Sequence, residues 1–227
     1  MATRSRRRKP LTRERVLDAA LAIADEDGIE ALSMRRLGQA LGVEAMSLYN
    51  HVANKGALVT AMVDRVVGDF ELPDDDAPWD DAIRRCAISA HDLLLAHPWA
   101  CTLALQPSDP SVVGGPRMRY MEWLLRRLRE AGFPPELAFS AYHTIDSHIF
   151  GFTVWQLGHA AGARRIAGDP DFERWARGFL AQMRPTHPFL AEHADQHLAS
   201  PPGEGQREFE FALDLILDGL KRLRRKR

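Results

Sequence analysis

The stretch 33–55, SMRRLGQALGVEAMSLYNHVANK, constrains the fold of this chain more than any other segment. Apolar residues recur four apart in each half of it, namely Leu37 with Leu41 and Leu48 with Val52. Residues four apart share one face of a helix, so each pair can dock on a third helix. Ser33 is placed to cap the first helix, and Gly42 stands where a helix ends in the left-handed conformation. The stretch therefore predicts two short helices joined by a tight turn.

The second of these helices carries hydrogen-bonding and apolar side chains beside its leucine. These residues are Ala45, Met46, Ser47, Tyr49, Asn50 and His51, and Lys55 follows them. Hydroxyl, amide and imidazole groups can bond base edges and phosphates, while alanine and methionine offer apolar contact. Such a set suits a helix that lies in the major groove of DNA.

Residues 28–58, GIEALSMRRLGQALGVEAMSLYNHVANKGAL, resemble the DNA-binding domain of the tetracycline repressor (TetR) family. Within this run, residues 48–55 are most similar to the tetracycline repressors themselves. The resemblance implies that the two short helices form a helix-turn-helix that binds an operator in double-stranded DNA.

The resemblance also implies roles for individual residues. Arg35 matches a base-contacting arginine of the family, and phosphate contacts that position the helix are implied for Ser47, Tyr49 and Lys55. Ala45 and Met46 replace polar and proline residues of the family. We therefore expect an operator sequence that differs from the tetracycline operator.

Two further helices should complete the DNA-binding domain. One begins after Thr12, a good capping residue, and ends at Asp27-Gly28; the other begins at Asn54 and carries an apolar stripe to Phe70. Residues 1–10 show no apolar periodicity and contain five cations. We expect them to form a disordered basic arm that contacts phosphates or the minor groove, the alternative being a solvated tail.

An acidic, proline-containing segment divides the chain. Residues 71–81, ELPDDDAPWDD, interrupt the periodic pattern with six acids and two prolines. We therefore expect a helix-turn-helix domain at 11–70 and a helical effector-binding and dimerisation domain at 78–227. Helical periodicity continues beyond the break, which predicts helices at about 78–96, 98–105, 117–131, 136–160 and 170–183, a final helix, and loops at 162–171 and 184–207. Because no strand pattern is convincing, the expected fold class is all-α.

The last predicted helix carries a strict heptad stripe. Its apolar residues alternate spacings of four and three: Phe209, Leu213, Ile216, Leu220 and Leu223. The helix at about 136–160 is apolar on most of its circumference and includes Ile145 and Phe152. Such a stripe can be internal core, but we favour a dimer interface of four helices, two from each copy.

Large apolar side chains and a few polar ones are spread over the other helices of the second part. The candidates for an effector site are His91, Trp99, Met118, Met121, Phe139, Tyr142, His143, Asp146 and Phe150. Ligand sites mix residues in this way, although a packed core would use them too. The sequence predicts a pocket for a small, largely apolar effector, with His143 and Asp146 orienting it by hydrogen bonds.

The second part also resembles the ligand-binding and dimerisation domain of the tetracycline repressors. The similar segments are residues 123–154 and 209–223. At positions that align with that family's ligands for magnesium and tetracycline, this chain has Thr102 in place of a histidine and Gln156 in place of an acid. Tetracycline is therefore not the expected effector.

These patterns predict a cytoplasmic, homodimeric transcriptional regulator, a repressor that binds a palindromic operator and is released by its effector. No apolar run reaches the roughly 18 residues that would span a membrane. We expect no cofactor, no metal and no enzymatic activity, since His143 and His148, five apart on a helix, point roughly 140° from each other. The alternatives are a DNA-compacting protein without an effector and a helical enzyme using the aromatic cavity, for which the sequence offers no titratable pair.

Overall fold

A computed structural model describes residues 10–74, 76–106, 114–166, 170–199 and 205–225 of the 227-residue chain. These residues form helices and turns, and no strand occurs among them. The fold class predicted from the sequence is confirmed. The chain divides into two compact units, 1–143 and 144–227, which are described separately below.

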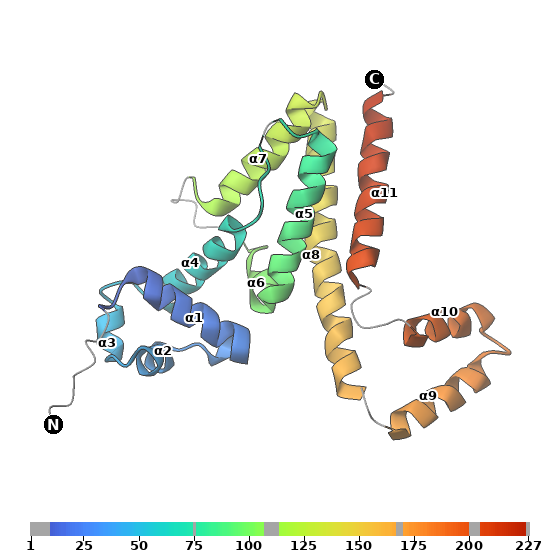
Figure 1. Ribbon diagram of the computed structural model, residues 1–227, viewed down its shortest axis with the longest axis horizontal. Coiled ribbons are helices and arrows are strands. Elements are labelled where there is room, and N and C mark those ends of the chain that lie inside the picture. Colours follow the sequence, from blue (N-terminus) through green and yellow to red (C-terminus); the bar gives the residue numbers. More distant parts are fainter. Residues whose placement is uncertain (1–9, 75, 107–113, 167–169, 200–204, 226–227) are drawn as a thin grey trace, which may run out of the picture. The chain divides into compact units, whose positions relative to one another are not determined.

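The first unit contains seven helices, one short 3-10 turn (η1) and the start of an eighth helix among its described residues (Figure 1). They are α1 (Arg13–Asp27), η1 (Ile29–Ala31), α2 (Met34–Leu41), α3 (Ala45–Leu48), α4 (Lys55–Gly68), α5 (Trp79–Ala96), α6 (Pro98–Leu103), α7 (Pro116–Glu130) and the first part of α8 (Pro135–Ile166). The predicted starts and ends agree with these bounds to within a few residues, except at α3 and α8.

Side-chain caps explain where three of the first four α-helices begin. The hydroxyl of Thr12 accepts a hydrogen bond from the backbone N–H of Arg15, and Ser33 accepts one from Arg36, each at 3.2 Å. The amide oxygen of Asn54 accepts from the N–H of Ala57 at 2.8 Å. Each cap satisfies a backbone donor that the first helical turn leaves without a partner.

A small apolar core holds α1 to α4 together. It is formed by fully buried side chains from all four helices: Val16, Ala20, Leu37, Leu48, Leu58 and Met62. Helix α3 has four residues and is too short to be stable alone, so burial of Leu48 is what holds it in place. Of the two predicted apolar pairs, Leu37 and Leu48 are fully buried, and Leu41 is half-buried.

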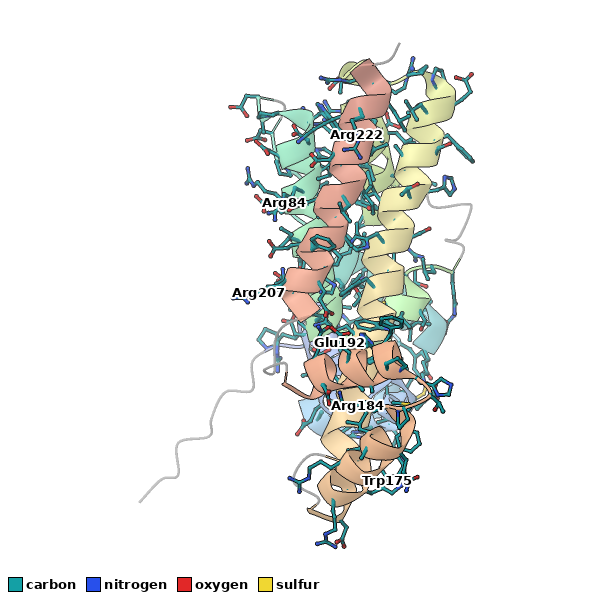
Figure 2. All side chains as sticks on the ribbon, turned by 90° about the vertical axis from the view of Figure 1, so that its right-hand side faces the viewer. Arg84, Trp175, Arg184, Glu192, Arg207 and Arg222 are labelled. Carbon is teal, nitrogen blue, oxygen red and sulfur yellow. The ribbon has the colours of Figure 1, made fainter. Side chains whose placement is uncertain are left out.

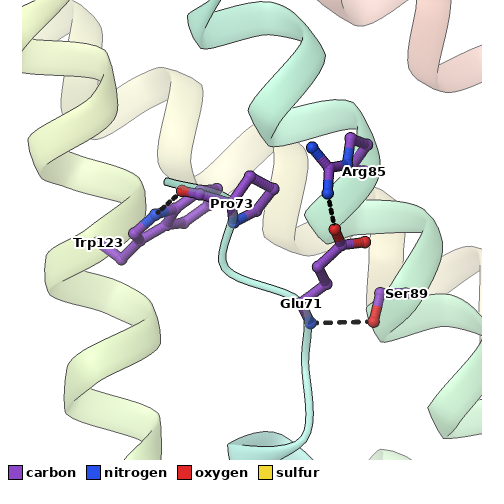
Figure 3. A network of polar contacts seen from close by, with 5 residues as sticks. All are labelled: Glu71, Pro73, Arg85, Ser89 and Trp123. Carbon is purple, nitrogen blue, oxygen red and sulfur yellow. Dashed lines mark hydrogen bonds and ion pairs between the residues drawn. The ribbon is translucent and has the colours of Figure 1, made fainter. Parts of the chain in front are cut away.

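The segment 71–77, called the linker here, joins α4 to α5 and is bonded on both sides (Figure 3). The backbone N–H of Glu71 donates to the hydroxyl of Ser89 on α5 at 3.0 Å, and its carboxylate pairs with Arg85. The indole of Trp123 on α7 donates to the carbonyl of Pro73 at 3.2 Å. Glu71 and Pro73, in the acidic, proline-containing segment that interrupts the sequence pattern, are therefore held by α5 and α7.

The second unit contains the rest of α8, α9 (Pro170–Met183), α10 (Pro188–Ala199) and α11 (Gly205–Arg225). Helix α10 corrects the prediction of a loop at 184–207, and α8 runs six residues beyond the expected end at 160. Helices α9 and α10 form a hairpin through buried Ala176, Leu180 and Ala191 and an ion pair between Arg184 and Asp195 at 2.6 Å. Trp175 lies at the surface of this hairpin, 59% exposed (Figure 2).

Helix α11 packs on α8 through aromatic rings. The imidazole of His148 stacks on Phe209 with ring centroids 4.6 Å apart, and Phe152 meets Phe209 edge to face at 5.6 Å. Burial lowers the pKa of His148, although its bond to the carbonyl of Phe209 acts in the opposite direction. The ring is therefore neutral near pH 7, with Nε2–H donating to that carbonyl at 3.0 Å.

The heptad stripe of α11 lies mainly inside the chain rather than at its surface. Ile145, Phe209, Leu213 and Leu220 are all buried within the single chain, so these four of the seven predicted interface residues cannot face a partner. Phe152 and Ile216 are half-buried, and Leu223 is exposed. The heptad spacing correctly marked a buried face, but it could not indicate what covers that face.

Candidate nucleic-acid interface

The turn between α2 and α3 is set by two glycines. Gly42 has φ +68° and ψ +35°, the left-handed conformation that glycine adopts most easily, as predicted. The N–H of Val43 donates to the carbonyl of Gly38 at 2.9 Å, which closes the turn. A Cβ on Gly38 would lie 2.8 Å from the carbonyl oxygen of Val43 and 3.2 Å from the nitrogen of Ala45. The close approach of α3 to α2 therefore requires a glycine at position 38.

Substituting Gly38 by alanine should destabilise the protein by about 1–3 kcal/mol, because the methyl group would meet backbone atoms that cannot move without opening the turn. The matched control is Gly178→Ala on α9, where an added Cβ meets nothing within 4 Å. Chemical denaturation of both variants measures the difference. Equal free energies of unfolding for the Gly38→Ala and Gly178→Ala variants would show that the turn tolerates a side chain at position 38.

The candidate DNA-binding side chains lie at the surface of this turn. Arg35, Met46, Tyr49, Asn50 and Lys55 are exposed, and Ala45, Ser47 and His51 are half-buried. Met46 is 75% and Tyr49 45% exposed, so both side chains are accessible to a partner molecule. These eight residues are called the reading surface below. Leu48, between them in sequence, points into the core and fixes the segment.

The predicted second helix was too long. Helix α3 ends at Leu48, and Tyr49, Asn50 and His51 lie in turns that follow it, closed by the N–H of His51 donating to the carbonyl of Leu48 at 2.9 Å. Val52, predicted to lie on the same helix, is buried but outside it. Side-chain spacing alone did not reveal this because turns of this kind also bury residues four apart.

An ion pair next to Arg35 was not predicted from the sequence. Arg36, the second basic residue of α2, pairs with Asp27 at the end of α1. The pair connects α1 to α2. Of the two adjacent arginines, Arg36 is therefore bonded within the protein, whereas Arg35 remains exposed. The partners are nine positions apart in the sequence, and nothing in the sequence distinguished Arg36 from Arg35.

The candidate effector residues are distributed over several places. Met118 and Met121 line an open pocket of about 560 Å³, the α7 pocket, together with Gly114, Arg119, Glu122, Trp123, Leu125 and Arg126. Phe139, Tyr142 and His143 form a separate ring cluster with centroids 4.3 Å and 5.0 Å from that of His143. The expectation of one shared space is therefore not supported for these residues of the first unit.

Four other candidates have different surroundings. His91 on α5 is fully buried, and Trp99 directs its indole N–H at Asp25 of α1 instead of a ligand space. Asp146 is half-buried and Phe150 buried in the second unit. Trp99 is the clearest correction, because its only polar atom is already bonded to a carboxylate.

Within the described part of the chain, no group of three or more His, Cys, Asp or Glu side chains could hold a metal ion. Among the same residues, no helix is both long and apolar enough to cross a bilayer. Both cysteines are buried, and burial raises the pKa of Cys101 to about 11, so this thiol does not ionise at neutral pH.

The tight glycine turn, the short docked α3 and the exposed polar and basic residues around it define a helix-turn-helix DNA-binding protein. Comparisons with known proteins agree. The model of "Bacterial regulatory proteins, tetR family" matches residues 16–62, and that of "Tetracyclin repressor-like, C-terminal domain" matches residues 72–224. The chain therefore belongs to the TetR family and is a DNA-binding transcriptional regulator.

Individual relatives cover most of the chain. The transcriptional repressor DrrR1 of Streptomyces coeruleorubidus is 37% identical over 224 residues, covering 96% of this chain and 80% of that protein. The class D tetracycline repressor of Escherichia coli is 31% identical over 166 residues, 71% of this chain and 73% of that protein. The structure of ActR from Streptomyces coelicolor in complex with actinorhodin has a TM-score of 0.68 and 29% identity, covering 93% of this chain and 97% of that one.

Proposed function

We propose that this protein is a homodimeric repressor that binds a palindromic operator and is released when a small molecule binds. The observation that carries the proposal is the reading surface, which presents eight candidate DNA contacts on a turn fixed by buried Leu37 and Leu48. The ActR complex with actinorhodin supports a ligand-responsive regulator. In this proposal residues 11–70 bind DNA, residues 78–227 bind the effector and dimerise, and the protein acts in the cytoplasm. Residues 1–9 of the basic arm lie outside the described residues, and contact of the arm with DNA remains a prediction.

Within the reading surface, the proposed division of labour separates bases from phosphates. Arg35 is exposed and can make a bidentate contact with a guanine, and Asn50 and His51 can bond base edges. Tyr49, Ser47 and Lys55 contact phosphates, which fix the orientation of the protein without reading sequence. Ala45 and Met46 supply apolar contact in the groove.

This division predicts different outcomes for two substitutions. Arg35→Ala should lower affinity for the operator by about 1–3 kcal/mol and leave affinity for random DNA nearly unchanged, because a base contact is lost. Tyr49→Phe should lower affinity for both DNAs alike, because its hydroxyl contacts phosphate. Fluorescence anisotropy with an operator selected from a random-sequence pool measures both. Equal losses for both variants on both DNAs would contradict the division, and a native protein without sequence preference would contradict the proposed function.

The dimer surface proposed from the structure differs from the one predicted from the sequence. On α11 the exposed large apolar residues are Phe211, Leu215 and Leu223. On α8 the exposed face contains Gly151, Val154, Trp155 and Gly158. A Cβ on either glycine would meet nothing within 4 Å, so these positions leave room for a partner helix to approach closely. These seven residues are called the dimer surface below, and they support a four-helix interface of α8 and α11 from two copies.

For the effector, the α7 pocket is the proposed site in the first unit. Met118, Met121 and Leu125 give it an apolar lining, while Arg119 and Glu122 can orient a polar group. The ActR complex makes actinorhodin the first compound to test. Tetracycline with magnesium should not release the protein, since Thr102 and Gln156 lack the ligands that the tetracycline repressors supply.

A further inference from the structure

One carboxylate at the end of α1 accepts two hydrogen bonds, one from His97, which joins α5 to α6, and one from Trp99 in the first turn of α6. The indole N–H of Trp99 donates to Oδ1 of Asp25 at 2.7 Å, and Nδ1 of His97 lies 2.8 Å from the same oxygen. Trp99 is 8% exposed, and the side chains of His97 and Asp25 are 24% and 30% exposed. The contact is therefore buried on its Trp99 side and open to water on its Asp25 side, and it joins residues more than 70 positions apart within the first unit.

The place of this carboxylate is unusual for a helix. The last turn of α1 carries Asp25, Glu26 and Asp27 and no basic residue. Negative charge at the C-terminal end of a helix is unfavourable, because the last carbonyl oxygens already give that end a partial negative charge. Two of the three acids have partners in other elements: Asp25 is bonded to His97 and Trp99, and Asp27 is paired with Arg36 of α2. The end of α1 thus connects α6 on one side with α2 on the other.

The short helix α6 is itself firmly placed. Pro98 begins it, and Trp99, Ala100 and Cys101 are all buried. Helix α1 is consequently bonded to a helix that is itself packed in the core, and the reading surface is joined to α1 through the Asp27–Arg36 pair and the shared core. A second ion pair, Asp64 of α4 with Arg117 of α7 at 3.3 Å, attaches the other side of the DNA-binding helices.

We propose that Asp25 is a positioning residue for DNA binding, which fixes the orientation of the reading surface by holding α1 on His97 and Trp99. The inference rests on the proposed function, because orientation matters only when two reading surfaces must meet one operator. In a dimer on a palindrome they lie about 34–36 Å apart, one turn of DNA. A half-site requires only one correctly folded reading surface. Loss of the Asp25 contact therefore weakens binding to the palindrome and spares binding to the half-site.

The experiment compares Asp25→Ala with the native protein on a palindrome selected from a random pool, on its single half-site, and on palindromes whose half-sites are moved by one or two base pairs. Removing hydrogen bonds to a charged group should lower affinity for the palindrome by about tenfold, with affinity for the half-site within about twofold. The preference for the native half-site spacing should weaken. Asp25→Asn, which keeps one oxygen able to accept both bonds, should restore most of the affinity.

Two controls separate positioning from other effects. Glu26→Ala removes an exposed negative charge from the same helical turn and should leave all three measurements unchanged. In a Trp99→Phe background, which removes the indole donor and keeps an aromatic ring, Asp25→Ala should have a smaller effect than in the native protein.

Each other outcome overturns a specific claim. Equal losses on palindrome and half-site would mean that Asp25 supports the fold of the reading surface or contacts DNA, and not its orientation. An unchanged palindrome affinity, or an undiminished effect in the Trp99→Phe background, would also reject the proposal. If the native protein itself selects no palindrome, it is the proposed function that fails.

Discussion

The double substitution Gly151→Lys with Leu215→Lys should convert the protein to a monomer and lower its operator affinity at least about a hundredfold. Both positions belong to the dimer surface, and in the single chain both can carry a lysine without clash. A Cβ on Gly151 meets nothing within 4 Å, and Leu215 is 56% exposed. Four lysines brought together across two copies would repel one another and lose their hydration, which is strongly unfavourable. Light scattering gives the mass, and fluorescence anisotropy gives the affinity.

Two controls define what this result would mean. Trp175→Lys replaces an exposed apolar residue outside the dimer surface, so the mass should remain that of a dimer. Leu213→Lys places a charge at a fully buried position and should unfold the chain rather than yield a folded monomer. A dimeric mass for the Gly151 and Leu215 double variant would show that the interface lies elsewhere on the chain.

The contrast between Leu213 and Leu215 shows what a sequence pattern can and cannot predict. The heptad spacing of α11 correctly identified a continuous apolar face, and Phe209, Leu213 and Leu220 on it are buried. Periodicity specifies the face but not its partner, so a stripe suited to another subunit and a stripe suited to the chain's own core look alike. The exposed residues Phe211 and Leu215 belong to a second, less regular face that the pattern did not reveal.

Local signals were the most reliable, because they depend on chemistry within a few residues. The caps at Thr12 and Ser33 and the left-handed Gly42 follow from hydrogen bonding and backbone sterics that the local sequence specifies. Together they placed the helix-turn-helix correctly. Helix α10 was missed because histidines, a proline and an alanine-rich stretch gave it no clear apolar period.

Contacts between residues that are distant in the sequence were the hardest to predict. Trp99 was expected to line a ligand site because large aromatic residues often do so, yet its indole binds a carboxylate 74 positions away. The pairing of Asp27 with Arg36 and the closeness of Gly38 to Val43 likewise depend on how helices pack. Residue type and spacing suggest what such side chains can do, but the tertiary fold decides which of them meet.

The other large effect is expected at the α7 pocket. Met121→Glu with Leu125→Glu should abolish release from the operator by the effector while leaving operator affinity without ligand unchanged, because charges in the apolar lining exclude a largely apolar ligand. The compound is identified first, in a thermal screen of the native protein that begins with actinorhodin. Coupling of the usual size would make the native protein lose about 5–150-fold in operator affinity at saturating ligand, and the double variant should lose none.

Two comparisons locate the site. Leu190→Glu changes an exposed apolar residue on α10 in the same way and should leave release intact. Tyr142→Ala with His143→Ala removes two of the three rings of the ring cluster, which was also a candidate for ligand contact. If this pair abolishes release and the α7 variant does not, the effector binds at the ring cluster. A ligand that raises the melting temperature of the native protein without changing its operator affinity would instead reject the coupling between the two functions.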